Sequence, residues 1–149
     1  MKTMLSAMSL VGLMLLATAL TADEKQKDEA PKPLCPVEGG PIDKSVSADY
    51  LGGKVYFCCP ACIPKFNADK GKYATKANLQ LVLTGQAKQT ACPLSGGKTN
   101  PKKTTQVAGV EIQFCCGNCQ GKVAKAKPEE QMEMVFGKGF AKAFTVAKK

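Results

Sequence analysis

The sequence predicts a small α+β fold built from two similar modules, each with a cysteine turn, a β-hairpin and a helix. The chain contains eight cysteines, and they fall into two groups of four with the same spacing. Cys58 follows Cys35 by 23 positions, and Cys115 follows Cys92 by 23 positions. A short alternating segment precedes each cysteine cluster and apolar residues at helical spacing follow it, which indicates a strand and then a helix.

The cysteine pattern is an internal repeat. Residues 57–62 read FCCPAC, and residues 114–119, which follow 57 positions later, read FCCGNC. Equal spacing in two divergent copies indicates that the cysteines act together, because loops otherwise tolerate insertions at little cost in free energy. Two agents impose such a constraint on cysteines: a metal ion held by thiolates, or disulfide bonds.

The N-terminal segment predicts export. Residues 1–22 begin with a positive charge, continue with a short apolar stretch and end with small residues, as secretory signal peptides do. The apolar stretch is too short for a transmembrane anchor. Cleavage after Ala19 or Ala22 would leave a periplasmic or secreted protein. Residues 23–33 are charged and lack apolar periodicity, so we expect a disordered leader there.

The rest of the chain divides into two modules. The cysteine spacing places the first module at residues 34–85 and the second at residues 91–149, with a polar linker at residues 86–90. Modules of this size bury little apolar surface and generally need a metal ion or disulfides to be stable. We therefore expect the cysteines to stabilise the fold whatever else they do.

Within each module the elements are expected in the same order. A turn at residues 39–41 follows the first cysteine, and turns at residues 52–53 and 108–109 join the two strands of each hairpin. Pro60 suits the first helical turn after the first hairpin. Residues 129–144 have the apolar spacing of an amphipathic helix, interrupted by two glycines.

The start of each helix bears on the acidity of the thiols. If Cys58 ends a strand and Cys62 lies in the first helical turn, free backbone N–H groups and the helix dipole lower the thiol pKa values and favour thiolate, which binds metal. The two-residue gap in each CxxC pair lets two sulfur atoms reach one tetrahedral ion. The first cysteine of each module, Cys35 or Cys92, would bind the same ion from the turn on the opposite side of the site. The candidate metal ligands are therefore Cys35, Cys58, Cys59 and Cys62 in the first module, and Cys92, Cys115, Cys116 and Cys119 in the second.

The cysteine pattern resembles that of the TRASH domain and the related YHS domain. The resemblance implies a treble-clef or zinc-ribbon-like module linked to the trafficking, resistance and sensing of heavy metals. It covers the cysteine turn, the hairpin and the helix start of each copy well and the helical remainder loosely. The matching residues, which the resemblance makes metal ligands, are Cys35-x22-Cys58-x3-Cys62 and Cys92-x22-Cys115-x3-Cys119.

The fourth ligand departs from the family pattern. YHS proteins commonly open with Asp-Pro-Val-Cys-Gly, which would place their first cysteine at the positions of Glu38 and Ser95 in this sequence. Our choice for the fourth ligand is Cys59 in the first module and Cys116 in the second. Glu38 is an alternative to Cys59 in the first module only.

Sulfur-rich sites without histidine suit soft or borderline ions. The chain contains no histidine, so Zn(II) is the first candidate. Cu(I) is the second candidate, if Cys59 and Cys116 are not ligands and each site has three thiolates. A closed site of four cysteines has no open coordination position for water, so we expect no metal-assisted hydrolysis. The sequence also lacks a nucleophile elbow and a phosphate-binding loop, and a non-enzymatic protein is predicted.

Two other interpretations stay open. Eight cysteines in an exported protein also suit a disulfide-stapled binding or structural protein without metal. A thiol–disulfide oxidoreductase that uses Cys59 and Cys62 as its redox pair is a more remote alternative, because no βαβ pattern surrounds these residues.

The charge of the chain predicts a solvated, basic surface. The formal net charge is +9, and all 21 basic residues are lysine. Arginine is the residue that phosphate and base recognition usually employs, so we expect no specific nucleic-acid binding. The lysines predict at most a weak attraction to anionic surfaces.

Overall fold

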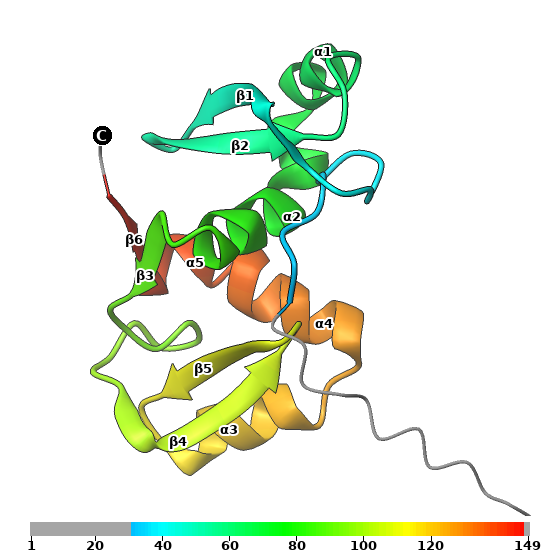
Figure 1. Ribbon diagram of the computed structural model, residues 1–149. Helices are drawn as coiled ribbons and strands as arrows, with labels where there is room; N and C mark the ends of the chain where they lie inside the picture. Colours follow the sequence, from blue (N-terminus) through cyan, green and yellow to red (C-terminus); the bar gives the residue numbers. More distant parts are fainter. Residues whose placement is uncertain (1–30, 148–149) are drawn as a thin grey trace, which may run out of the picture.

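The computed structural model describes residues 31–147 (Figure 1). The signal peptide expected at residues 1–22 and most of the expected leader lie outside the described residues. The small α+β fold is confirmed in its coarse form, with short strands, short helices and two cysteine clusters. In chain order the elements are β1 (Asp43–Tyr50), β2 (Gly53–Phe57), α1 (Cys62–Ala68), α2 (Lys70–Leu83), β3 (Ala87–Gln89), β4 (Asn100–Val107), β5 (Val110–Phe114), α3 (Gly117–Ala124), α4 (Pro128–Met132), the π-helical turn η1 (Glu133–Gly137), α5 (Phe140–Ala143) and β6 (Phe144–Val146).

The two hairpins have the same register. β1 pairs antiparallel with β2, and β4 pairs antiparallel with β5. Asp43 lies opposite Phe57 in the first hairpin and Asn100 lies opposite Phe114 in the second, and an irregularity in the register follows in both. Bulges of this kind bend a strand and increase its twist. The 57-residue offset of the cysteines therefore also relates the hairpins that lead to them.

Both hairpin turns have two residues with positive φ, as type I′ turns require. The turn at residues 108–109 is where the sequence predicted it. The prediction for the first hairpin was wrong by one residue, because the turn uses Leu51 (φ 52°) and Gly52 (φ 87°). Gly53 instead begins β2, where a Cβ atom would lie 2.9 Å from Oε1 of Gln86. Gly53 is thus closely surrounded by side chains of other elements and is not part of the turn.

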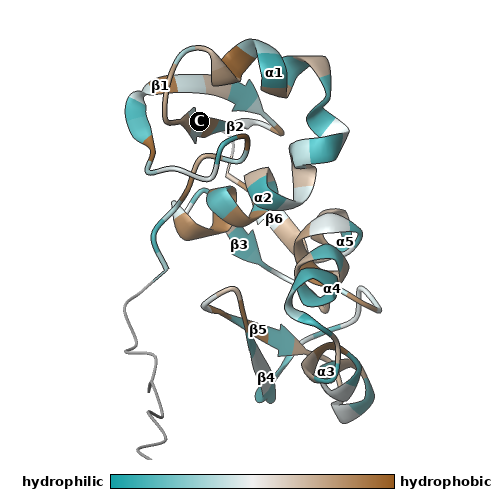
Figure 2. Ribbon diagram, turned by 90° about the vertical axis from the view of Figure 1, so that its right-hand side faces the viewer, coloured by the Kyte–Doolittle hydropathy of each residue, from teal (hydrophilic) through white to brown (hydrophobic). Residues whose placement is uncertain are grey.

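A third, two-stranded sheet joins the two halves of the chain. β3 pairs antiparallel with β6, and Lys88 lies opposite Thr145 at its centre. The segment 86–90, interpreted from the sequence as a linker, contains β3. Lys88 and Thr145 are themselves 57 positions apart, so each strand pairs with its counterpart around an approximate two-fold axis. In Figures 1 and 2 the two hairpins lie at opposite ends of the molecule, with this sheet and α2 between them.

Helix α2 packs against η1 in the middle of the molecule. Asn78 on α2 donates a hydrogen bond from Nδ2 to the carbonyl oxygen of Phe136 (2.7 Å), and this contact is buried. At the exposed edge, Thr75 Oγ1 donates to Glu133 Oε2 (2.7 Å). The helix expected at residues 129–144 is divided into α4, η1 and α5. Its second glycine, Gly139, packs so closely that a Cβ atom would lie 2.8 Å from the carbonyl oxygen of Pro93.

Aromatic side chains fill the core differently in the two halves. In the first half, Phe66 on α1 contacts Tyr50 and Phe57, each with ring centroids 5.4 Å apart. The second aromatic group lies near the middle of the molecule, where Phe144 stacks on Phe140 at 5.1 Å. Within residues 31–147 no helix is long and apolar enough to cross a membrane.

We expect the Asn78→Ala variant to lower the free energy of unfolding by about 1–3 kcal/mol, because it leaves the buried carbonyl of Phe136 without its hydrogen-bond donor. Chemical denaturation of the reduced protein measures this loss. Thr75→Ala removes the exposed contact of the same helix pair and should change stability by about 0.5 kcal/mol or less. An equal loss of stability in the two variants would contradict the conclusion that the buried Asn78 hydrogen bond stabilises the packing of α2 on η1.

Candidate metal centres

Three cysteines meet at the first centre, each delivered by a different element. Cys35 lies in the turn before β1, Cys58 follows the last residue of β2, and Cys62 is the first residue of α1. Their Sγ atoms all lie within 4.8 Å of one another. The turn is closed by two backbone hydrogen bonds, from Cys35 N to Gly40 O (2.8 Å) and from Gly39 N to Cys35 O (2.9 Å). This turn fixes the direction of the Cys35 thiol.

The second centre has the same construction. The Sγ atoms of Cys92, Cys115 and Cys119 also lie within 4.8 Å of one another. Cys92 N donates to Gly97 O (2.8 Å), and Gly96 N donates to Cys92 O (2.8 Å). Gly96 has a φ of 73°, close to the 75° at the equivalent Gly39. A side chain would be strained in this left-handed conformation, so both cysteine turns need glycine.

The remaining two cysteines lie beside these triads. Cys59 Sγ is 3.6 Å from Cys62 Sγ in the first half. In the second half, Cys116 Sγ is 3.7 Å from Cys115 Sγ. All eight predicted residues are therefore found at the two clusters, three at the centre of each and one at its edge.

The sulfur–sulfur distances suit a tetrahedral thiolate site. A regular tetrahedron with Zn–S bonds of about 2.3 Å has sulfur atoms about 3.8 Å apart. The Sγ atoms of Cys58 and Cys62 are 3.7 Å apart, and those of Cys115 and Cys119 are also 3.7 Å apart. A disulfide bond would need about 2.05 Å, and all eight cysteines are free. The two clusters could therefore hold a metal ion each.

Glu38, the alternative fourth ligand, is directed elsewhere. Its carboxylate accepts a hydrogen bond from Lys65 Nζ at 2.8 Å, in an ion pair that is exposed to solvent. The equivalent position in the second half is Ser95, whose Oγ lies 3.2 Å from Cys115 Sγ. The two centres thus differ beside the cysteine turn.

The helix-start cysteines are less acidic than the sequence led us to expect. Burial raises the pKa of Cys62, and the neighbouring thiols of Cys59 and Cys58 raise it further. Burial likewise raises the pKa of Cys119, together with the thiols of Cys115 and Cys116, to about 12. The expected lowering was wrong for these two residues, because desolvation disfavours the charged thiolate more than the helix start favours it.

The pKa values of the two cysteines in the turns are lowered. Burial alone would raise the pKa of Cys35, but hydrogen bonds from the backbone N–H groups of Glu38 and Cys58 outweigh it and lower the pKa. At Cys92 the effect of burial is again outweighed, here by hydrogen bonds from the side chain and backbone of Ser95, and the pKa falls to about 6. The pKa values of the edge cysteines are lowered as well, that of Cys59 chiefly by a hydrogen bond from the Cys62 thiol and that of Cys116 chiefly by a hydrogen bond from the backbone N–H of Cys119.

A glutamine that the sequence analysis missed connects the first cysteine turn to its hairpin. Gln80 on α2 accepts a hydrogen bond from Tyr56 N (2.7 Å) and donates from Nε2 to Tyr56 O (2.8 Å). The same Nε2 donates to the carbonyl oxygen of Leu34 (2.8 Å), the residue before Cys35. Gln80 is 1% exposed. It fixes the distance between the turn of Cys35 and the strand that ends before Cys58.

Gln89 on β3 makes the same three contacts in the second half. It accepts a hydrogen bond from Gln113 N (3.0 Å), and its Nε2 donates to Gln113 O (2.6 Å) and to Ala91 O (2.9 Å). Ala91 precedes Cys92 just as Leu34 precedes Cys35. The two glutamines are not equivalent in sequence, so the repeat gave no signal for them.

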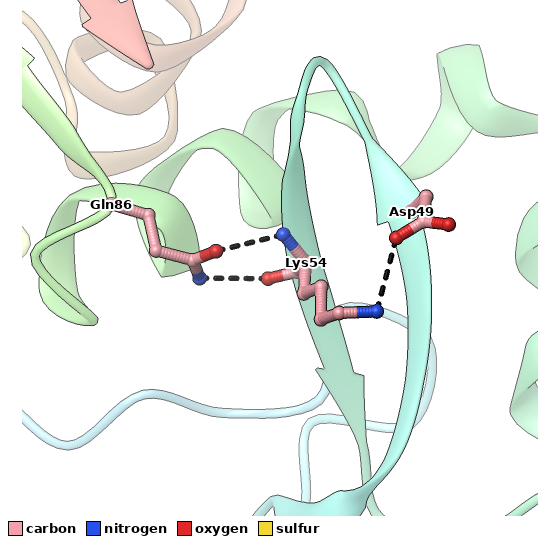
Figure 3. Close-up of polar contacts among 3 residues, drawn as sticks. All are labelled: Asp49, Lys54 and Gln86. Carbon is pink, nitrogen blue, oxygen red and sulfur yellow. Dashed lines mark hydrogen bonds and ion pairs between the residues drawn. The ribbon is translucent and has the colours of Figure 1, made fainter. Parts of the chain in front are cut away.

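A third glutamine completes the outer edge of β2 (Figure 3). Gln86 accepts a hydrogen bond from Lys54 N (2.7 Å) and donates to Lys54 O (2.8 Å). Lys54 also forms an ion pair with Asp49 across the hairpin (3.1 Å). Edge strands leave backbone groups unpaired, and here glutamine side chains pair those of Lys54 and Tyr56. Within the described part of the chain, the Gln86 side chain forms its hydrogen bonds with Lys54 and Thr84 and none with the cysteine turn.

A cavity of about 560 Å³ lies beside the first centre. Its wall is mostly apolar, with Leu34, Leu79 and Leu83 among the lining residues, and Cys35 is its one thiol. Cys35 is only 1% exposed, so the cavity gives little access to the sulfur atom. The cysteine clusters, rather than this cavity, are the candidate functional sites.

Comparison with protein-family models, with curated proteins and with solved structures found no match to the chain. The two clusters are compatible with a metal-binding domain but do not identify the TRASH or YHS family. That resemblance therefore stays a prediction from the cysteine pattern.

We expect Gln80→Ala to weaken metal binding at the first centre by about 10–100-fold, the usual range for residues that orient metal ligands. Gln89→Ala should do the same at the second centre, and each variant should leave the other centre unchanged. Competition with a chromophoric chelator measures both affinities. Gln86→Ala is the matched control, since it removes a glutamine from the same hairpin edge without touching a cysteine turn. A similar loss in this control would show that the effect is one of general stability.

Proposed function

We propose that this chain is an exported, non-enzymatic protein that binds a thiophilic metal ion at two cysteine-thiolate centres and serves in heavy-metal handling, trafficking or sensing. One observation carries the proposal: in each half of the chain, three sulfur atoms from separate elements lie within 4.8 Å of one another. Unbonded thiols gathered at this distance are costly to ionise together, and a cation removes that cost. The export step rests on the signal-peptide pattern of residues 1–22.

Zn(II) is the first candidate for the ion and Cu(I) the second. The donor set is sulfur alone, which suits both ions. Cys59 and Cys116 would complete a tetrahedral site for Zn(II), whereas the triads without them would suit Cu(I). When bound, Zn(II) in a closed four-sulfur site supplies structural cross-linking and no open position for water. The proposed module type is a TRASH-like or YHS-like domain, present twice in tandem.

Lysine supplies positive charge near the first centre. Four thiolates around one divalent ion leave a net negative charge. Lys65, three residues after Cys62, lies close enough for the negative charge at Cys62 to contribute to raising the pKa of the lysine, after the larger effects of Glu38. A nearby ammonium group favours the thiolate form that binds metal.

The runner-up is a disulfide-stapled protein without metal. Export to an oxidising compartment supports it. The sulfur–sulfur distances of 3.6 and 3.7 Å in the first cluster favour metal instead, since they are those of a shared ion rather than of a covalent bond.

Purification under gentle, reducing conditions should yield protein with about two metal equivalents per chain, one for every four thiols. Elemental analysis gives the metal content, and titration with the thiol reagent DTNB gives the free thiols. We expect slow reaction with the reagent until a chelator removes the metal, followed by reaction of all eight cysteines.

Protein without metal and without free thiols would instead support the disulfide-stapled alternative. The oxidoreductase alternative has a separate readout, catalytic reduction of a disulfide substrate by the Cys59–Cys62 pair. Turnover that is lost in Cys59→Ser would contradict the non-enzymatic role.

A further inference from the structure

The two centres differ in how far their cysteines are covered. Cys62 is 1% exposed, whereas the equivalent Cys119 is only partly buried. Cys59 is partly buried, whereas the equivalent Cys116 is exposed. An incoming ligand therefore reaches the second centre more easily than the first.

Among the described residues, an ion pair joins the cysteine turn to the following helix at the first centre and not at the second. Glu38 follows Cys35 by three residues and binds Lys65 on α1, the helix that begins with Cys62. The equivalent position in the second half is Ser95, which carries no charge and contacts Cys115 instead. Exposed ion pairs add little to stability, but this one bridges the two elements that would have to separate to release an ion.

The helices behind the two centres carry different apolar side chains at equivalent positions. Phe66 on α1 is fully buried and contacts Phe57, Tyr50 and Tyr73. The residue 57 positions later is Val123 on α3, a smaller side chain without ring contacts. Val123 is buried as fully as Phe66, so the difference between the two helices lies in side-chain size and in the ring contacts of Phe66.

Two glycines lower the stability of α3. Gly117 and Gly121 both lie within α3, where the first half has Pro60 and Pro64 at the equivalent positions. A Cβ atom added at either glycine would meet nothing within 4 Å. Close packing therefore does not require these glycines, and their effect is to lower the stability of the helix that carries Cys119.

We propose that the two centres have different tasks: the first retains its ion as part of the fold, and the second is the exchangeable centre, which passes its ion to a thiol-rich acceptor. This inference rests on the proposed metal-binding function. Transfer occurs by ligand exchange without oxidation or reduction. An acceptor thiol loses its proton, and its thiolate forms a bond to the ion as the bond to Cys116 or Cys119 breaks. The released cysteine thiolate takes up one proton, so the number of protons bound to sulfur is unchanged.

Release of Zn(II) from the loaded, full chain to an excess of a chromophoric chelator tests this assignment. We expect two phases of about one equivalent each, with rates at least about tenfold apart. Gly121→Ala should slow the fast phase by about three- to fivefold, the effect of replacing one glycine in a helix interior, and should leave the slow phase unchanged. Glu38→Ser, which gives the first centre the residue found in the second, should accelerate the slow phase only.

Gly71→Ala is the matched control. Gly71 lies in α2, where an added Cβ atom would make only an ordinary contact of 3.5 Å with Asp69. This substitution should change neither phase. Release of both equivalents in one phase, or slowing of the slow phase by Gly121→Ala, would overturn the inference while leaving metal binding intact. Protein that binds neither Zn(II) nor Cu(I) would overturn the proposed function itself.

Discussion

The structure depends on holding a turn cysteine and a helix-start cysteine within 4.8 Å of the cysteine that follows a hairpin. This arrangement is unfavourable for bare thiolates, because like charges at such distances repel and burial disfavours each of them. Burial and the neighbouring thiols accordingly raise the pKa values of Cys62 and Cys119. A bound cation would reverse it, since coordinated thiols are deprotonated and binding releases their protons. Metal affinity and folding would then be two measures of the same interaction.

The halves do not form two independent cores. β3 and β6 pair across the approximate two-fold axis, and α2 packs on η1 through the buried amide of Asn78. β6 also reaches the first hairpin, where a Cβ atom at Gly53 would lie 3.2 Å from Val146. Each hairpin is therefore supported by residues from the middle of the molecule. A shared core of this kind allows one centre to be loosely held while the other keeps the chain folded.

The sequence predicted the features that depend on local chemistry. Equal cysteine spacing identified both groups of four cysteines, the family resemblance pointed to the three in each that form a triad, and alternating residues identified both hairpins. β3 was not recognised because three residues acquire a partner only through β6, more than 50 positions away. Gln80 and Gln89 were not recognised because they reach equivalent backbone groups from non-equivalent elements. The predicted acidity of the helix-start cysteines was wrong at Cys62 because a sequence does not show how far a thiol is buried.

X-ray absorption spectroscopy of the zinc-loaded chain tests the central claim most directly. The account predicts two zinc ions per chain, each with a first shell of about four sulfur atoms at about 2.3 Å. A first shell of oxygen or nitrogen atoms, or a reduced protein that retains no zinc, would contradict it.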